Sequence, residues 1–324
     1  MMQDRRILIL GAGGFVGKHL IRDLEGRFGG AADVVATSRQ GKGGLIALDL
    51  MDDAALRDML QRLQPTHIIN LVGIAAPAEA RKNTRMAWEL HAMAPERLGH
   101  LILEIVPHCW FFHMGSGLVY GRSALDISPI DETAVLRPMD IYGVTKAAGD
   151  LAVGMLAEEG LRCLRLRPFN HTGPGQSENF AIPSFASQIA RIEAGLQPPV
   201  LKTGNLDVIR DFLDVRDVAA AYGQLIAETE RLAPGTVFNI ASGTGWKMAD
   251  MLDALITNSH MEITVEPDPT RQRESDLPKL VGDASALRHS VSWVPNYTLH
   301  QTLHDILYAF RNPRDLGKRS LVGN

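Results

Sequence analysis

Residues 6–18 read RILILGAGGFVGK, and this stretch decides the fold class. Residues 6–10 form a near-continuous apolar run, which is typical of a strand buried on both faces. A helix follows in which Val16, Leu20 and Leu24 share one face. Four glycines follow the strand, at Gly11, Gly13, Gly14 and Gly17. A strand, a glycine-rich turn and a helix N-terminus together predict a site for a dinucleotide pyrophosphate. A glycine triplet without this context would indicate only a tight turn.

Composition narrows the class of protein. The chain has 324 residues, which favours about two domains, and 45% of its residues are hydrophobic. A net charge of -4 gives no electrostatic case for nucleic acid or an anionic membrane as partner. No apolar run is long enough to cross a membrane. Cys109 and Cys163 lie in apolar, strand-like segments and are expected to be reduced core residues. We therefore expect a cytoplasmic protein.

Apolar runs alternate with amphipathic segments over the first half of the chain. Strands are expected at residues 6–10, 33–37, 45–48, 66–72, 110–114 and 162–167, and helices at residues 54–63, 88–105 and 141–158. Pro95 is expected in a kink or in a first helical turn. This alternation predicts an α/β fold with a doubly wound parallel Rossmann sheet and right-handed crossovers.

The pattern changes after Pro168, where glycine, proline and polar residues become frequent. We expect a smaller, interleaved C-terminal substrate domain there. Strands at residues 208–215 and 236–240 are expected to return to the large sheet. The predicted division is residues 1–169 plus 208–242 for a dinucleotide-binding Rossmann domain, and residues 170–207 plus 243–324 for the substrate domain.

Three side chains form the candidate catalytic group. Ser116 follows the strand at residues 110–114, and Tyr142 and Lys146 lie four residues apart on the next helix, in the motif YGVTK. Residues at this spacing project from one helix face. A Tyr-x-x-x-Lys pair alone is often only surface decoration. Its place after the fifth strand of a dinucleotide fold, together with Ser116, favours catalysis.

These motifs resemble the extended short-chain dehydrogenase/reductase family. The resemblance continues in RDFLDVRDV (residues 210–218) and FNIASG (residues 238–243). Within the family, RPFNHTGPGQ (residues 167–176) and PDPTRQRESDLPKLVGD (residues 267–283) resemble the GDP-6-deoxy-D-mannose reductases. The resemblance implies an NADP(H)-dependent enzyme that reduces the 4-keto group of a nucleotide 4-keto-6-deoxy sugar.

 The reaction that the resemblance implies is the conversion of GDP-4-keto-6-deoxy-D-mannose to GDP-D-rhamnose. The enzyme is expected to be a homodimer in the cytoplasm.

The resemblance also implies roles for the three catalytic candidates. Tyr142 would exchange a proton with the sugar oxygen, Ser116 would donate a hydrogen bond to the same oxygen, and Lys146 would hold the nicotinamide ribose. A free tyrosine has a pKa of about 10. The ammonium of Lys146 and a cationic nicotinamide are expected to lower the pKa of Tyr142.

Cofactor contacts are expected from loops at the carboxyl ends of the strands. They are Gly11, Gly13, Gly14, Phe15, Val16, Gly17, Ser38, Arg39, Asp49, Leu50, Leu71, Val72, Gly73, Tyr142, Lys146, Pro168 and Phe169. The second strand ends without the carboxylate that usually holds the ribose 2′-OH of NAD. Ser38 and Arg39 can instead bind a 2′-phosphate, so NADP is expected over NAD. A solvated loop arginine is the alternative for Arg39.

Substrate contacts are expected from six residues: Ser116, Gly117, Asn170, Arg210, Arg271 and Arg273. The resemblance places Asn170 and Arg210 at the nucleotide-sugar diphosphate, which the planar guanidinium suits. For Arg271 and Arg273 a solvated basic loop is equally open.

Other polar residues are expected to be structural. No metal is expected, because Asp211, Asp214 and Asp217 at a strand–helix junction indicate capping and surface charge. His171 is expected to make a local hydrogen bond. Many members of the family carry Asn where this chain has His91, and a structural role is expected for it.

Alternative functions remain open within and beyond this family. Related 4,6-dehydratases carry a glutamate where this chain has Leu118, so elimination of water is not expected. A nucleotide-sugar epimerase or a dTDP-sugar reductase would share the fold. A non-catalytic NADP-binding regulator would not need Ser116, Tyr142 and Lys146 together.

Overall fold

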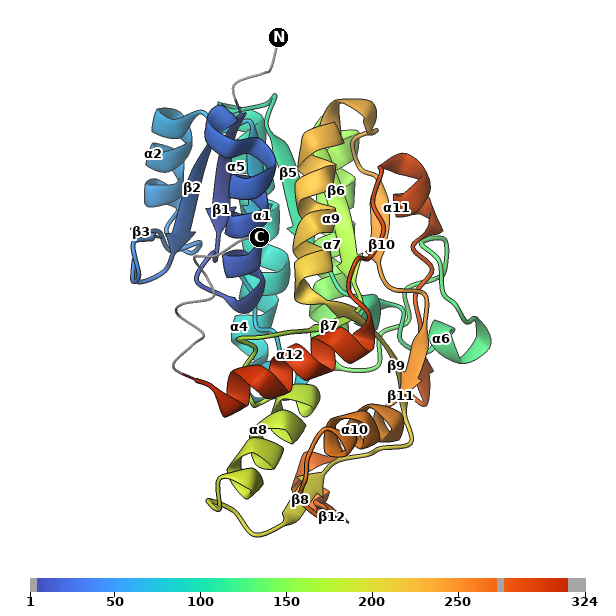
Figure 1. The fold of residues 1–324 in the computed structure, drawn as a ribbon. Coiled ribbons are helices and arrows are strands. Elements are labelled where there is room, and N and C mark those ends of the chain that lie inside the picture. The colour runs from blue at the N-terminus through green and yellow to red at the C-terminus, as the bar shows by residue number, and fades with distance from the viewer. Residues whose placement is uncertain (1–4, 273–276, 314–324) are drawn as a thin grey trace.

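The computed structural model describes residues 5–272 and 277–313. Its centre is a parallel sheet of seven strands in the order β10-β6-β5-β4-β1-β2-β3 (Figure 1). The strands are β1 (Arg5–Leu10), β2 (Ala32–Ser38), β3 (Ile46–Ala47), β4 (His67–Asn70), β5 (Trp110–Met114), β6 (Cys163–Pro168) and β10 (Val237–Ile240). The predicted doubly wound Rossmann sheet is confirmed.

Alternate residues of β1 face two separate cores. Ile7 and Ile9 pack with the first core and Leu8 and Leu10 with the second, and at most 2% of any of these side chains is exposed. Side chains of a strand alternate between the faces of a sheet, so burial on both faces requires a continuous apolar run. This is why residues 6–10 show no polar alternation.

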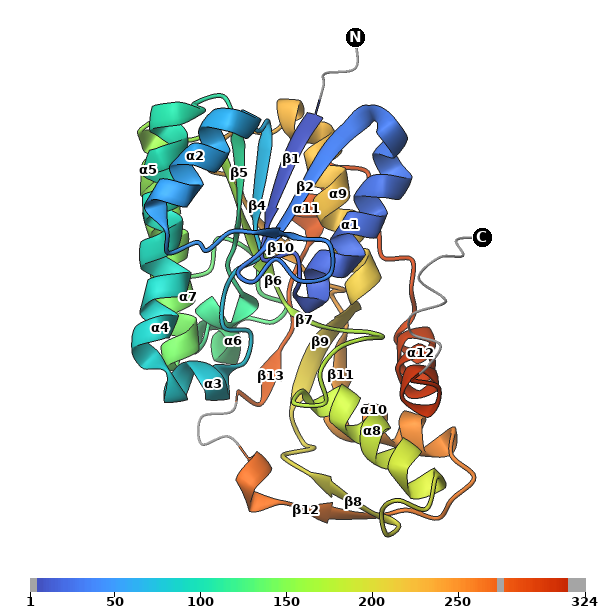
Figure 2. The same ribbon diagram turned by 90° about the vertical axis from the view of Figure 1, so that its left-hand side faces the viewer.

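Helices cover both faces of the sheet (Figure 2). α1 (Phe15–Phe28) and α9 (Val215–Glu228) pack together on the first core. The second core contains residues of α2 (Asp53–Leu63), α5 (Ala94–Ile105) and α7 (Ile141–Glu158). The helix that follows the glycine-rich turn therefore packs on the first core. Tyr142 and Lys146 lie on a helix of the second core.

The helix expected at residues 88–105 is interrupted. α4 (Thr84–Trp88) leads into a π-helical turn, η2 (Glu89–Met93), and α5 then begins with Pro95 in its first turn. Proline is tolerated there because the first N–H groups of a helix have no intrahelical acceptor. α3 (Pro77–Lys82) precedes this segment.

A second sheet lies beyond the carboxyl ends of the large one. It joins β7 (Asn170–Thr172), β9 (Ile209–Asp214), β11 (Gly245–Lys247) and β13 (Lys279–Leu280), with β9 paired to the other three. The expectation that residues 208–215 return to the large sheet is wrong. Periodicity predicts a strand but not its partner. The other expected return is correct, because β10 pairs with β6.

The remaining elements form a smaller unit with its own core. They are α8 (Ala181–Glu193), β8 (Val200–Thr203), α10 (Met248–Thr257), β12 (Thr264–Pro267) and α12 (Leu299–Arg311). Figure 1 shows them below the large sheet. Leu287, from α11 (Ser285–Ser290), and Trp293 are instead buried in the first core of the large sheet. The predicted domain boundaries stay a prediction.

Two further expectations concern the whole molecule. Cys109 and Cys163 are buried and unpaired, as expected of core thiols. Among the described residues, no helix has both the length and the apolar character that crossing a membrane requires.

Candidate active site

The turn between β1 and α1 forms a cradle of backbone. Gly11 has a φ of +76°, and a Cβ there would lie 3.0 Å from the backbone nitrogen of Val72. A Cβ on Gly17 would lie 2.4 Å from the backbone oxygen of Ala12. Gly14 caps α1 without a side-chain hydrogen bond. The first N–H groups of α1 therefore have no side-chain cap, and they suit a bound phosphate. The turn fits a dinucleotide.

Phe15 and Val16 begin α1 directly after this turn. The ring of Phe15 stacks on that of His171, with 6.2 Å between their centres. His171 also contacts the backbone oxygen of Phe169 through Nδ1, at 3.1 Å. His171 thus makes the local hydrogen bond that the sequence predicts, and it supports the cradle from the second sheet.

Ser116, Tyr142 and Lys146 come together where β5 ends and α7 begins. Asp140 caps α7 by accepting a hydrogen bond from the Gly143 N–H at 2.7 Å, and this fixes the first turn that carries Tyr142. Lys146 donates from Nζ to the backbone oxygen of Met114 at 2.8 Å. All three candidate side chains are less than 10% exposed, at 7%, 9% and 7%.

The pKa of Tyr142 differs from the expectation. Burial raises it to about 12, and the hydrogen bond from Ser116 only partly opposes this shift. Ala80 and Ala87 pack against the ring, so the phenolate would lie in apolar surroundings. At neutral pH Tyr142 is therefore protonated and able to donate.

Lys146 is a buried ammonium. Burial lowers its pKa to about 8. It lies against the loop after β4, where a Cβ on Gly73 would be 3.4 Å from its Nζ. In that loop, the Val72 N–H donates to the Asn70 side chain at 3.1 Å, and the Leu71 N–H donates to the backbone oxygen of Leu10 at 2.9 Å. The structure thus brings residues 71–73 to α7 and to the glycine turn.

Ser38 and Arg39 lie where β2 ends. The Ser38 Oγ accepts a hydrogen bond from the Gly41 N–H at 3.1 Å, and a Cβ on Gly13 would lie 3.4 Å from the Cβ of Ser38. Arg39 is exposed. Asp49 accepts a hydrogen bond from the Met51 N–H at 3.0 Å, and Leu50 is buried. Ser38 therefore adjoins the glycine turn, with Arg39 in solvent beside it.

Pro168 and Phe169 lie at the end of β6. A Cβ on Gly117 would lie 3.0 Å from the ring of Phe169, so the two backbones approach closely. The same ring stacks on Tyr120 and is 4% exposed. The ring of Phe169 therefore packs against the Ser116–Gly117 turn.

The expected substrate residues are dispersed. Asn170 begins β7 beside β9, which carries Arg210. Arg210 is 7% exposed and donates to the Ile209 oxygen at 2.8 Å. Arg271 donates to Ser184 at 2.8 Å, with 43% of its side chain exposed. Arg273 lies outside the described residues.

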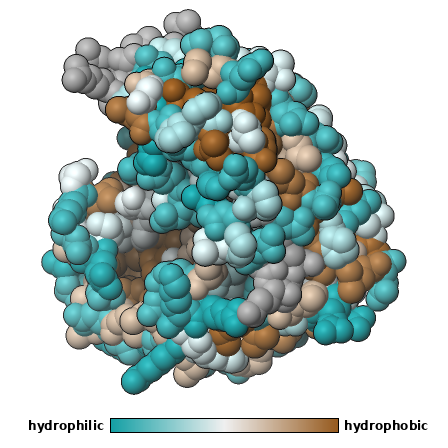
Figure 3. Space-filling model, turned by 90° about the horizontal axis from the view of Figure 1, so that it is seen from below, coloured by the Kyte–Doolittle hydropathy of each residue, from teal (hydrophilic) through white to brown (hydrophobic). Residues whose placement is uncertain are grey.

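Arg271 belongs to a polar cavity in the smaller unit. The cavity has a volume of about 220 Å³ and is lined by Glu178, Asn179, Ser184, Gln188, Arg191 and Arg271. None of the three catalytic candidates lines it. Figure 3 views the molecule from below, and the surface there is hollowed, with a hydrophilic rim around a partly hydrophobic interior.

The three aspartates on β9 and in the first turn of α9 are not surface charges. Asp211, Asp214 and Asp217 are 1%, 3% and 1% exposed. Asp214 caps α9 by accepting from the Arg216 N–H at 2.8 Å, as expected. Asp211 accepts four hydrogen bonds from Ser242, Gly243 and Gly282. Buried carboxylates need such partners, and here they join separate loops. The described residues contain no group that could hold a metal ion.

A buried ion network behind α7 was not predicted from the sequence. Asp150 is fully buried and accepts from Arg167 at 2.7 Å and from Arg165 at 2.9 Å. Burial raises the pKa of Asp150, but the two arginines outweigh it and hold the pKa below its usual value. Asp150 follows Tyr142 and Lys146 at four-residue spacing. This third polar residue on the same helix face could have indicated the network from the sequence.

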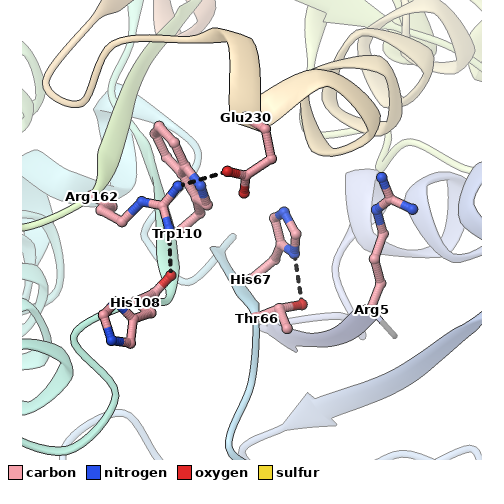
Figure 4. A pocket seen from close by; sticks show the side chains of 7 residues that line it. All are labelled: Arg5, Thr66, His67, His108, Trp110, Arg162 and Glu230. Atoms are coloured by element: carbon pink, nitrogen blue, oxygen red, sulfur yellow. Dashed lines mark hydrogen bonds and ion pairs between the residues drawn. The ribbon is translucent and has the colours of Figure 1, made fainter. Parts of the chain in front are cut away.

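A separate cavity lies at the opposite edge of the sheet, where the strands begin. It has a volume of about 290 Å³ and is lined by Arg5, Thr66, His67, His108, Trp110, Arg162 and Glu230 (Figure 4). His67 begins β4 and Trp110 begins β5. None of the predicted site residues lines this cavity.

Comparison with known proteins agrees with this geometry. Residues 7–241 match the model of the NAD dependent epimerase/dehydratase family. The chain is 34% identical over 304 residues to a GDP-6-deoxy-D-mannose reductase of Pseudomonas aeruginosa, covering 94% of this chain and 96% of that protein. It is 24% identical to a GDP-6-deoxy-D-talose 4-dehydrogenase of Aggregatibacter actinomycetemcomitans, covering 87% of this chain and 90% of that protein.

A solved structure supports the same conclusion. RMD from Pseudomonas aeruginosa, complexed with NADPH, has a TM-score of 0.83 and 30% identity, covering 95% of this chain and 99% of that chain. The extended short-chain resemblance is confirmed. With its Rossmann sheet, its glycine cradle and a family match over most of its length, the chain belongs to the NAD-dependent epimerase/dehydratase family.

Proposed function

We propose that this protein is an NADP(H)-dependent reductase of the 4-keto group of a nucleotide 4-keto-6-deoxy sugar. The proposed reaction converts GDP-4-keto-6-deoxy-D-mannose to GDP-D-rhamnose. The observation that carries it is the 34% identity to a GDP-6-deoxy-D-mannose reductase over 94% of the chain. The arrangement of Ser116, Tyr142 and Lys146 supports it independently.

The protonated state of Tyr142 suits reduction. NADPH, when bound, would supply a hydride to the carbonyl carbon, and negative charge would develop on the carbonyl oxygen. Ser116 donates a hydrogen bond to that oxygen. Tyr142, whose pKa burial raises to about 12, carries the proton that completes the alcohol. Lys146 holds the nicotinamide ribose from the same helix.

Binding of the whole cofactor uses four regions. The glycine turn with Phe15 and Val16 holds the pyrophosphate, and residues 71–73 with Pro168 and Phe169 line the nicotinamide. Asp49 and Leu50 lie on the adenine side. Ser38 and the exposed Arg39 bind the 2′-phosphate, which supports NADP over NAD.

For the substrate, Asn170 and Arg210 bind the diphosphate, with Ser116 and Gly117 beside the sugar. Arg271 joins them from the smaller unit, and Arg273 is proposed from the sequence alone. Thermal stabilisation by NADP together with GDP, UDP or dTDP tests this assignment. At equal concentrations the nucleotide that binds most tightly stabilises most, by about 2.7 kcal/mol at 100 times its dissociation constant, and we expect this nucleotide to be GDP. Greater stabilisation by UDP or dTDP would favour the epimerase or the dTDP-sugar reductase.

We also propose a homodimer, in which the α4–α5 and α7 surface of one protomer meets that of the other. Leu151 and Met155 lie four residues apart on α7 and are 59% and 46% exposed. Met93 is 51% exposed on η2, which contacts α7. Exposed apolar groups of this kind mark interaction surfaces. Light scattering of Leu151→Glu should show a monomer if this surface mediates dimerisation, and an unchanged mass would exclude it.

We propose a cytoplasmic location, which the two buried, unpaired cysteines support. Cell fractionation tests it, and recovery from an extracytoplasmic fraction would contradict it.

A further inference from the structure

His91 lies inside the candidate site rather than beside it. Its side chain is 0% exposed on the π-helical turn η2, and its ring meets that of Tyr142 edge to face, with 5.4 Å between their centres. The helices approach closely here, since a Cβ on Gly149 of α7 would lie 1.9 Å from the backbone oxygen of His91. Such a contact leaves little freedom for the imidazole.

The two ring nitrogens of His91 contact two different elements. Nε2 accepts a hydrogen bond from the Ile74 N–H at 3.0 Å, in the loop after β4. Nδ1 lies 2.8 Å from the Thr145 Oγ1, on α7 between Tyr142 and Lys146. The Thr145 hydroxyl lies 3.1 Å from the backbone oxygen of Tyr142, to which it can donate. The imidazole thus links the loop after β4 to the catalytic turn of α7.

These contacts favour one tautomer, because it satisfies more of the neighbouring donors and acceptors. A backbone N–H can only donate, so Nε2 must be unprotonated to accept from Ile74. The hydrogen is then on Nδ1 and is donated to Thr145. In the other tautomer, Nε2 would face the Ile74 oxygen at 3.1 Å and the Ile74 N–H would lose this acceptor. Burial first, and then Lys146, lowers the pKa of His91 to about 3, so the ring is neutral.

The link lies where cofactor and catalytic residues are proposed to meet. A Cβ on Gly73 would be 3.2 Å from Cδ2 of His91 and 3.4 Å from Nζ of Lys146. The Gly73–Ile74 backbone is therefore held against both side chains. A displacement of about 1 Å in such a constellation can cost about 10²-fold in rate.

We propose that His91, as the neutral Nδ1–H tautomer, is a positioning residue that sets the distance between the Gly73–Ile74 loop and Tyr142–Lys146. The inference rests on the proposed function, because it assumes that the loop lines the nicotinamide and that Tyr142 delivers the proton. It goes further by giving a defined task to a residue at which this chain departs from many relatives.

The tautomer is tested without substrate. In ¹⁵N NMR of the selectively labelled protein, His91 is assigned by comparison with His91→Phe, and its protonated nitrogen is identified as Nδ1 or Nε2. We expect Nδ1–H, unchanged from pH 6 to pH 9. An Nε2–H tautomer, or protonation of both nitrogens in this range, would overturn the proposal.

Three variants separate the two hydrogen bonds from packing. His91→Asn can retain a contact near Nδ1, His91→Gln can retain one near Nε2, and His91→Phe keeps a ring but neither bond. His67→Gln is the matched control. His67 is also buried and has a pKa that burial lowers to about 3. It contacts Thr66 at the opposite edge of the sheet (Figure 4), and its Nε2 lies 3.0 Å from the Thr229 hydroxyl.

The expected result is a graded loss in kcat. His91→Phe should lower kcat about 10- to 100-fold, leave the KM for the sugar within twofold, and weaken NADPH binding measured by fluorescence. His91→Asn and His91→Gln should lie between it and wild type. His67→Gln should lower the melting temperature while kcat and NADPH binding stay unchanged.

A merely structural role gives a different pattern. If His91→Phe lowers the melting temperature as His67→Gln does, but kcat per folded molecule and NADPH affinity stay within twofold of wild type, the proposal is wrong. Failure of wild-type protein to reduce the keto sugar would contradict the proposed function instead. The NMR and NADPH-binding measurements would then still decide the role of His91.

Discussion

The ammonium of Lys146 donates a hydrogen bond of 2.8 Å to the backbone oxygen of Met114, the last residue of β5. This contact fixes the lysine of α7 at the carboxyl edge of the sheet. Met114, which accepts the hydrogen bond, stands two residues before Ser116 in the sequence. Burial lowers the pKa of Lys146 to about 8, so the protein carries a desolvated charge at its proposed catalytic centre. Such a group should cost stability.

Lys146→Met should raise the free energy of unfolding at pH 7 and abolish reduction. The folded pKa is below the unfolded value, so the unfolded chain binds more protons between about pH 8 and pH 10.5. The penalty is full below pH 8 and disappears as the pH rises through 10.5. Its size is on the order of 3 kcal/mol, from which the lost hydrogen bond subtracts. Urea unfolding at pH 7 and pH 10 should show a smaller gain at pH 10. A gain independent of pH would contradict this explanation.

Tyr142→Phe should lower kcat by at least about 100-fold, because it removes the proton donor, and should leave NADPH binding nearly intact. Stopped-flow measurement of NADPH oxidation and fluorescence titration check the two parts. Tyr222→Phe is the control, since Tyr222 is buried between α9 and the sheet. A kcat of Tyr142→Phe within threefold of wild type would remove Tyr142 from the mechanism.

Arg39→Ala should reduce the preference for NADPH over NADH, because the exposed guanidinium is proposed to pair with the 2′-phosphate. The measurement is the ratio of kcat/KM for the two cofactors. Lys42→Ala, which removes another exposed cation of the same loop, should leave that ratio unchanged. An unchanged ratio in Arg39→Ala would exclude the role of Arg39.

Asp150→Asn should destabilise the protein by about 3–5 kcal/mol, because it leaves the buried Arg167 without its carboxylate. Glu104→Gln breaks an exposed ion pair with Arg57 and should cost much less, because solvent screens that pair. Urea unfolding of both variants gives the comparison. Equal losses would show that the network contributes no more than a surface pair.

Much of the fold could be predicted because local sequence specifies it. The two-sided burial of β1 requires the apolar run at residues 6–10, and the expected bounds of β5 and α7 agree with the structure. The partner of β9 could not be predicted, because strand pairing depends on distant segments. The π-helical turn at His91 depends likewise on close packing against Gly149.

The candidate site could be predicted in part. The spacing of Tyr142 and Lys146 predicts their shared face, and the structure places Ser116 with them. The pKa of Tyr142 could not be predicted, since it depends on which alanines pack against the ring. Arg271 lies in a loop whose place depends on the fold of the smaller unit.

The central claim is that the protein reduces an existing 4-ketone and performs no dehydration. It is tested most directly by following NADPH absorbance when purified protein receives GDP-mannose or the 4-keto-6-deoxy product of a separate dehydratase. We predict stoichiometric NADPH consumption with the keto sugar and no reaction with GDP-mannose, because Leu118 cannot move a proton where related dehydratases carry a glutamate. Conversion of GDP-mannose to a keto sugar by this protein alone, or NADPH-independent interconversion of sugar epimers, would contradict the account.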